Sequence, residues 1–135
     1  MHSINLAKKI ARLAYHKQAI DIRILDLRGL TSAADFFIIC SGSVDIHVRA
    51  ITDFIIKELR PDKIRPYSIE GTDTCRWVLT DYIDVIFHCF LPESRDYFNL
   101  EGLWADAPVM PVDPVSGRIT TLTEAKRRRQ SGAFA

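Results

Sequence analysis

The stretch DFFIICSGS, residues 35–43, decides the fold of this chain. The run from Phe36 to Cys40 is continuously apolar and consists mostly of aromatic and β-branched residues. Such a run predicts a strand that is covered on both faces and therefore lies in the middle of a sheet. The polar SGS that follows it predicts a tight turn.

After this turn the apolar residues fall on one stripe of a helix. The stripe consists of Val44, Val48, Ile51, Ile55 and Leu59. Ser43 or Asp45 can cap the N-terminus of this helix, and Pro61 follows its end. Strand, polar turn and helix together predict a crossover helix packed on a sheet, which indicates an α/β fold.

Two elements are expected before this unit. Residues 4–17 carry apolar side chains at the spacing of an amphipathic helix, with Lys8, Lys9 and Arg12 on its other side. Residues 19–27, AIDIRILDL, alternate apolar and charged side chains, which predicts a strand with one buried face.

Three strands and a helix are expected after it. RPYSIEG, residues 65–71, is a short strand candidate. RWVLT (76–80) and IDVIFHCFL (83–91) are strand patterns separated by two residues, which predicts an antiparallel hairpin. PESRDYFNL (92–100) begins with proline and predicts a short helix. The whole order predicts a single α/β domain, whose mixed sheet of about five strands is flanked by helices.

The composition changes after Pro108. Prolines are closely spaced from Pro108 to Pro114, and the remainder is polar and basic. We therefore expect a folded domain over residues 1–108 and an extended or flexible, proline-containing, basic tail over residues 109–135. Within that tail, TLTEAKRRR could form a short helix on a partner.

Composition and charge restrict the class of protein. The 135 residues suffice for one hydrophobic core, and a net charge of +1 argues against a strongly basic nucleic-acid binder. No apolar run is long enough for a signal peptide or a membrane span, so we expect a cytoplasmic protein without membrane contact. The odd set of separated cysteines, Cys40, Cys75 and Cys89, favours buried, reduced thiols over a disulfide or a metal site. We expect no metal and no cofactor.

The SGS turn allows one enzymatic interpretation. A Gly-Ser turn between strand and helix resembles the signature of nucleotidyltransferases, and helix N-terminal amides favour phosphate. Those enzymes also need a carboxylate pair on the next strand to hold a metal, and RPYSIEG offers Glu70 alone. A polar capping turn is therefore favoured, and nucleotide binding or transfer at Gly42 and Ser43 is the alternative.

Other titratable residues form no catalytic set in the sequence. Asp81 and Asp84 are three residues apart, a spacing that places strand side chains on opposite faces and not around one metal. A turn could bring them together, but solvated turn carboxylates or acidic contacts for a basic partner are favoured. His88 lies in the apolar run VIFHCF, where a histidine packed in the sheet is favoured over a general base. No serine or cysteine nucleophile can be matched to it.

Aromatic residues are dense in the second half of the chain. They are Trp77, Tyr82, Phe87, Phe90, Tyr97, Phe98 and Trp104. Aromatic side chains are enriched at the centres of protein interfaces, where one of them can contribute about 2 kcal/mol or more. For Trp77, an interface role and core packing are both open.

These segments, taken together, resemble a known family. ADFFIICSGS, IEG, RWVLTDYIDVIFHCF and YFNLEGLWADAP are similar, in order and spacing, to the ribosomal silencing factor family, also called Iojap-related proteins. The likeness covers residues 4–108. It implies a nucleotidyltransferase-like fold without the catalytic carboxylates. It also implies a translational repressor that is not an enzyme, which binds a basic ribosomal protein (the fourteenth of the L series) on the intersubunit face of the large subunit and blocks joining of the small subunit.

The resemblance carries over to individual positions as expected partner-binding residues. From the strand-turn-strand motif these are Trp77, Asp81, Tyr82, Asp84 and His88, and from the C-terminal motif they are Tyr97, Asn99, Leu100, Leu103 and Trp104. The target is basic, so exposed acids beside aromatic anchors would complement it. Ile83 departs from the family, which usually has glycine there; a glycine-free two-residue turn is unfavourable, so a wider hairpin is expected.

Two further expectations concern parts outside these motifs. The basic run Lys126, Arg127, Arg128 and Arg129 is hypothesised to touch ribosomal RNA phosphates, and a solvated tail is the alternative. Exposed strand edges could also pair two copies into a homodimer away from the ribosome.

Overall fold

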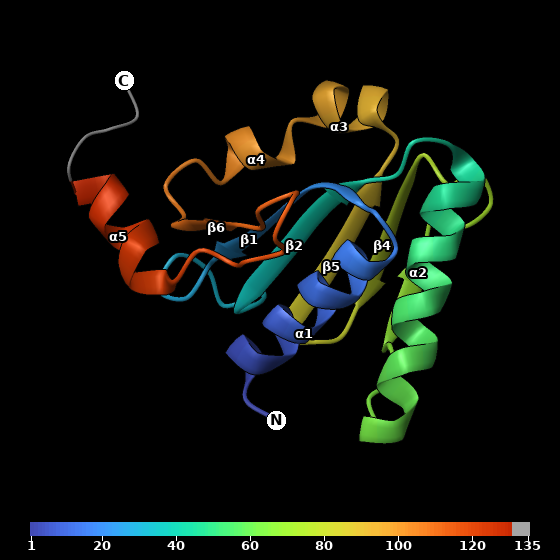
Figure 1. The fold of residues 1–135 in the computed structure, drawn as a ribbon, viewed down its shortest axis with the longest axis horizontal. Helices are drawn as coiled ribbons and strands as arrows, with labels where there is room; N and C mark the ends of the chain where they lie inside the picture. The colour runs from blue at the N-terminus through green and yellow to red at the C-terminus, as the bar shows by residue number, and fades with distance from the viewer. Residues whose placement is uncertain (131–135) are drawn as a thin grey trace.

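The computed structural model describes residues 1–130; of residues 129 and 130 it describes the backbone alone. It contains a six-stranded mixed sheet of order β3-β4-β5-β2-β1-β6, shown in Figure 1. The strands are β1 (Ile20–Asp26), β2 (Phe36–Ser41), β3 (Ser68–Glu70), β4 (Trp77–Asp81), β5 (Val85–Phe90) and β6 (Val109–Pro111). The helices are α1 (Ser3–His16), α2 (Asp45–Leu59), η1 (Arg60–Asp62), α3 (Pro92–Phe98), α4 (Leu100–Leu103) and α5 (Leu122–Gln130). The expected α/β class and the order of elements up to residue 100 are confirmed.

β2 lies in the middle of the sheet, as its apolar run predicts. All six of its residues are buried. It pairs in parallel with β5 and antiparallel with β1. In the parallel pair Cys40 faces Cys89, and all three cysteines of the chain are buried free thiols, as expected.

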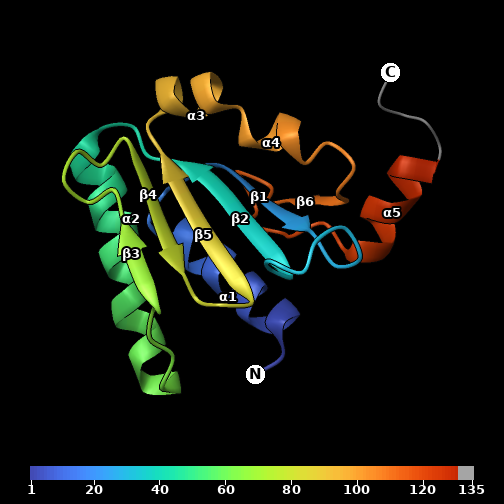
Figure 2. The same ribbon diagram turned by 180° about the vertical axis from the view of Figure 1, so that it is seen from behind.

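The two faces of the sheet are covered differently. α1 and α2 pack against one face, where fully buried side chains such as Ile10, Ile51 and Phe87 form the larger core cluster. On the other face, α3, α4 and the segment after them cover β6, β1, β2 and the C-terminal end of β5, where Phe90 is fully buried, through Leu100, Trp104 and their neighbours. Figure 2 shows that β3, β4 and the remainder of β5 have no helix in front of them on this side.

The sheet continues past Pro108, the expected end of the folded domain. β6 pairs antiparallel with β1, and its Met110 is fully buried. Beyond it Val112 bridges Ile119, and Ala125 of α5 joins the larger core cluster. Proline spacing misled the prediction because an edge strand tolerates proline on its unpaired side. The short helix considered for the basic segment is present as α5.

We expect Met110→Ala to lower the free energy of unfolding by about 2 kcal/mol, because it leaves a cavity between β6 and the core. Urea denaturation followed by fluorescence measures this loss. Val115→Ala, at a position that is 88% exposed in the same segment, is the matched control and should change stability by less than about 0.5 kcal/mol. Equal stability of the two variants would show that β6 does not contribute to the core.

Candidate partner-binding face

The β4–β5 hairpin forms the candidate site. Its strands pair antiparallel, with Trp77 opposite Phe90, Leu79 opposite His88 and Asp81 opposite Ile86. The alternate residues of β4, such as Val78, belong to the core under the helices, so these pairs point to the other face. We call the uncovered part of that face the open face. Its side chains are Ser68, Glu70, Trp77, Leu79, Asp81 and Ile86.

Trp77 is packed against aromatic neighbours and is also partly exposed. Its ring stacks on Phe90 at a centroid distance of 4.9 Å and touches Phe98 at the same distance. Its indole Nε1 donates a hydrogen bond of 3.0 Å to His88 Nδ1. The residue is nevertheless only half-buried. Trp77 is therefore held in one orientation while part of its ring remains available to a partner.

His88 supports Trp77 from below and offers no surface of its own. It is 2% exposed, and burial lowers its pKa to about 3, so the ring is neutral. Because Nδ1 accepts from Trp77, the proton of the neutral ring lies on Nε2, which has no hydrogen-bond partner within residues 1–130. Direct partner contact, expected for His88 from the motif, does not fit this burial. Its role would be to position Trp77.

Tyr82 also differs from the expectation. It is 6% exposed and packs into the core on the helix side of the sheet. Burial raises the pKa of its phenol above the ordinary value. Tyr82 is therefore a core residue of the turn and not part of the open face.

The β4–β5 turn is wider than two residues, as the missing glycine suggested. β4 ends at Asp81 and β5 begins at Val85. Tyr82 N–H donates to Val85 O at 2.9 Å, and Asp84 N–H donates back to Tyr82 O at 3.1 Å around Ile83. Ile83 adopts a φ of 75°, which is unfavourable for a β-branched residue.

The acidic residues of the motif are divided between the turn and the open face. Asp81 points to the open face, and its Oδ1 accepts from Ile83 N–H at 2.7 Å. The side chain of Asp84 is exposed at the turn. Residues 68–106 contain eight carboxylates but only two arginines, one of which, Arg95, is buried. The part of the chain that carries the open face is therefore net acidic.

α3 and α4 form an aromatic and apolar rim beside the open face. Tyr97 is 83% exposed and Leu103 is 75% exposed, so both are free to meet a partner. Leu100 and Trp104 are half-buried on the smaller core cluster, where Trp104 meets Phe37 edge-on. Asn99 has a structural role, because its side chain caps α4 by accepting from Gly102 N–H.

A buried arginine fixes this rim to the sheet. Arg95 Nε donates to Glu101 Oε1 at 2.8 Å, and Nη1 donates to Ser41 Oγ at 3.0 Å. It thereby joins α3 to α4 and to the end of β2. Sequence reasoning missed Arg95 because one arginine in a polar helix carries no periodic signal. It also missed Leu79 and Ile86, which the alternation with Trp77 could have indicated.

The Gly42–Ser43 turn is closed by its own neighbours. His47 Nδ1 accepts from Ser43 N–H at 2.9 Å, so this amide is already engaged. A Cβ on Gly42 would lie 2.7 Å from a methyl of Val48, which explains the glycine by close packing. Val44 occupies the N-cap of α2, so neither Ser43 nor Asp45 caps it as expected. The turn has the form of a packed helix start.

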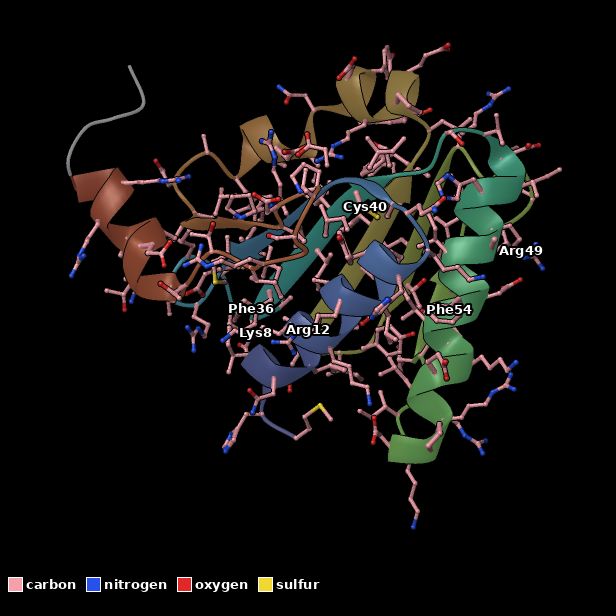
Figure 3. All side chains as sticks on the ribbon, viewed as in Figure 1. Lys8, Arg12, Phe36, Cys40, Arg49 and Phe54 are labelled. Atoms are coloured by element: carbon pink, nitrogen blue, oxygen red, sulfur yellow. The ribbon has the colours of Figure 1, made fainter. Side chains whose placement is uncertain are left out.

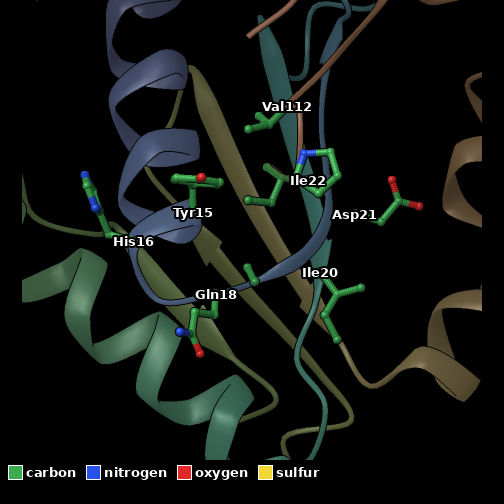
Figure 4. Close-up of a pocket in the computed structure, with 9 residues that line it drawn as sticks. Tyr15, His16, Gln18, Ile20, Asp21, Ile22 and Val112 are labelled. Carbon is green, nitrogen blue, oxygen red and sulfur yellow. The ribbon is translucent and has the colours of Figure 1, made fainter. Parts of the chain in front are cut away.

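A hollow of about 550 Å³ lies at the C-terminal end of α1, and Figure 4 shows its lining. Tyr15, Gln18, Ile22 and Val112 contribute side chains of mixed character. Asp21 is the one carboxylate in this lining, so the hollow has no converging set of charged groups.

Comparison with known proteins identifies relatives over most of the chain. Residues 1–134 match the family described as "Ribosomal silencing factor during starvation". A ribosomal silencing factor of Bacillus subtilis is 40% identical over 113 residues, which cover 84% of this chain and 96% of that protein. A mouse protein named "Mitochondrial assembly of ribosomal large subunit protein 1" is 32% identical over 70% of this chain and 43% of its own length. A crystal structure of a Chromobacterium violaceum protein superposes with a TM-score of 0.75 at 30% identity, covering 78% of this chain and 88% of that one.

Ile83→Gly is expected to raise the free energy of unfolding by about 1 kcal/mol, because glycine adopts the positive φ of this turn without strain. Chemical denaturation gives the value. Ile83→Ala is the control, since it removes the same exposed side chain but keeps a Cβ. If both substitutions raise the free energy of unfolding equally, the exposed isoleucine side chain lowers the stability and the positive φ of residue 83 does not.

Arg95→Met should cost about 2 kcal/mol of stability, because Glu101 and Ser41 lose a buried partner. Arg23 also donates to Glu101 but is 41% exposed, so Arg23→Met should cost less than about 1 kcal/mol. Thermal unfolding of both variants tests this order, and an equal loss would contradict the assigned role of Arg95.

Proposed function

Because the chain belongs to the ribosomal silencing factor family, we propose that it represses translation by binding the large ribosomal subunit and blocking the joining of the small one. The name of the mouse relative, which refers to the large subunit, supports this choice of subunit. The observation that carries the proposal is the uncovered, acid-bordered aromatic face of β3–β5. Its partner would be the basic ribosomal protein that the family resemblance implies, the fourteenth of the L series.

The open face has the composition of an interface centre. Trp77 is held by His88 and Phe90, so little side-chain freedom would be lost when a partner covers it. Leu79 and Ile86 extend the apolar area beside it. A preorganised aromatic residue of this kind can account for about 2 kcal/mol or more of binding free energy.

The acidic border would select a basic partner. Glu70, Asp81 and Asp84 surround the apolar centre, and long-range attraction to a basic protein would raise the association rate. Tyr97, Leu103 and Trp104 of the rim would add contacts on the side of α3 and α4. Leu100 would act by supporting Trp104.

A protein that blocks subunit joining needs only to stay bound to its site and catalyses no reaction. The family is described as a silencing factor, which agrees with such a role. Phosphate binding at Gly42 and Ser43, the alternative function, would compete with His47 for the Ser43 amide. No observation favours nucleotide transfer over docking, so a non-enzymatic role is proposed.

The basic C-terminal segment and self-association remain secondary parts of the proposal. Lys126 and Arg127 are exposed on α5 and would contact ribosomal RNA, while the side chain of Arg129 lies outside the described residues. The edge strand β3 could pair with a second copy away from the ribosome.

Within residues 1–130, every helix is too short or too polar to cross a bilayer.

The proposal predicts that the purified protein co-sediments with large subunits and reduces the fraction of joined ribosomes in a sucrose gradient. Leu79→Ala combined with Asp84→Lys should raise the Kd for large subunits at least about tenfold, because it removes apolar area and reverses a charge. Glu58→Lys, on α2 behind the sheet, is the matched control and should bind normally. Unchanged affinity of the double variant would move the docking site away from the open face.

A further inference from the structure

Positive charge is concentrated at the N-terminus of the chain. Residues 1–19 contain Lys8, Lys9, Arg12 and Lys17 but no aspartate or glutamate, whereas residues 68–106 are strongly acidic. The net charge of +1 therefore hides an uneven distribution of charge. Apart from the basic run on α5, a second group of basic residues is carried by α1, on the side of the sheet opposite to the open face (Figures 1 and 2).

The basic residues of α1 form one outward stripe. Lys8, Arg12 and His16 follow one another at a spacing of four residues, which brings neighbouring side chains within about 6 Å. Figure 3 shows Lys8 and Arg12 on this helix. The opposite side of α1, including Ala7 and Ile10, is fully buried in the core. The stripe is thus presented by a rigid helix.

The charges of this stripe are not neutralised within the part of the chain that the structure describes. Lys9 forms an ion pair with Asp62, and Lys17 lies over the ring of Phe54 at 5.0 Å. No carboxylate of residues 1–130 forms an ion pair with Lys8 or Arg12. An open hollow of about 590 Å³ lies along the stripe. It is lined by Met1, Asn5, Lys8, Lys9, Arg12, Leu13 and His16.

We propose that the stripe of Lys8, Arg12 and His16 binds the phosphate backbone of RNA. The choice of RNA rests on the proposed function, which brings the protein to a particle built largely of RNA. Lys8 and Arg12 are two cations one helical turn apart, without a carboxylate paired to either, and they suit neighbouring phosphates, which are bound mainly through charge, while the exposed His16 extends the stripe as a hydrogen-bonding side chain. A lipid surface fits less well, because the apolar side of α1 is buried in the core and has nothing to insert.

The stripe and the docking face can be occupied together. The N-terminal half of α1 lies at the same end of the sheet as the β4–β5 turn that carries Asp84. A basic protein covering the open face would therefore leave α1 uncovered at its side. RNA next to that protein would be within reach of Lys8 first.

The test compares the salt dependence of binding to purified large subunits. Lys8→Gln combined with Arg12→Gln should lower the slope of log Kd against log salt concentration by about 1.5, because two phosphate contacts are lost. At low salt its Kd should rise about tenfold, and at high salt it should approach that of the unmodified protein. Lys57→Gln with Arg60→Gln removes the same charge from the end of α2 and η1, and should leave the slope unchanged. Melting curves of both variants verify that the fold is kept.

The outcomes separate this proposal from the proposed function. If the unmodified protein does not bind large subunits, the proposed function fails and the RNA partner fails with it. If it binds and both double variants shift the slope equally, or neither does, only the α1 contact is overturned. A polyglutamate chain that competes for the stripe as strongly as an RNA duplex of equal charge would assign it to an acidic protein and overturn the choice of RNA.

Discussion

The parallel pairing of β2 with β5 is the constraint on which the remainder of this structure depends. Parallel neighbours cannot be joined by a tight turn, so the chain must leave the sheet after Ser41 and return elsewhere. It leaves through α2, which covers one face, and returns through β3 and β4 as a meander with short connections. No crossover remains to cover the other side of these strands. The open face is thus a consequence of the sheet topology.

Those side chains are organised in two levels. The lower level is buried: His88 and Phe90 hold Trp77, and Arg95 holds the α3–α4 rim. The side chains above them are half-buried or exposed: apolar residues lie at the centre of the open face, and carboxylates lie around it. A rigid lower level means that a partner would meet a preformed surface, which lowers the entropic cost of binding.

Much of the fold follows from local sequence periodicity, whereas the details of the site depend on geometry that periodicity does not contain. The apolar run at Phe36 and the alternation around Trp77 predict strands correctly, because each pattern shows directly which faces of the strand are buried. β6 escapes the prediction because prolines surround only three strand residues. The family motif implies partner contact for Tyr82 and His88, but both are buried. A three-residue turn sends Tyr82 to the helix side, and the pairing of His88 under Trp77 is visible only in three dimensions.

The cysteine pair in the middle of the sheet has a practical consequence for studying this protein. Cys40 and Cys89 face each other across β2 and β5 and both are fully buried, and the interaction with the Cys40 thiol, together with burial, raises the pKa of Cys89. Reaction with an alkylating reagent requires an exposed thiolate, so neither sulfur can react until the two strands separate. The rate at which these thiols are labelled therefore measures how often the centre of the sheet opens. It distinguishes global unfolding from fraying of peripheral elements without any engineered probe.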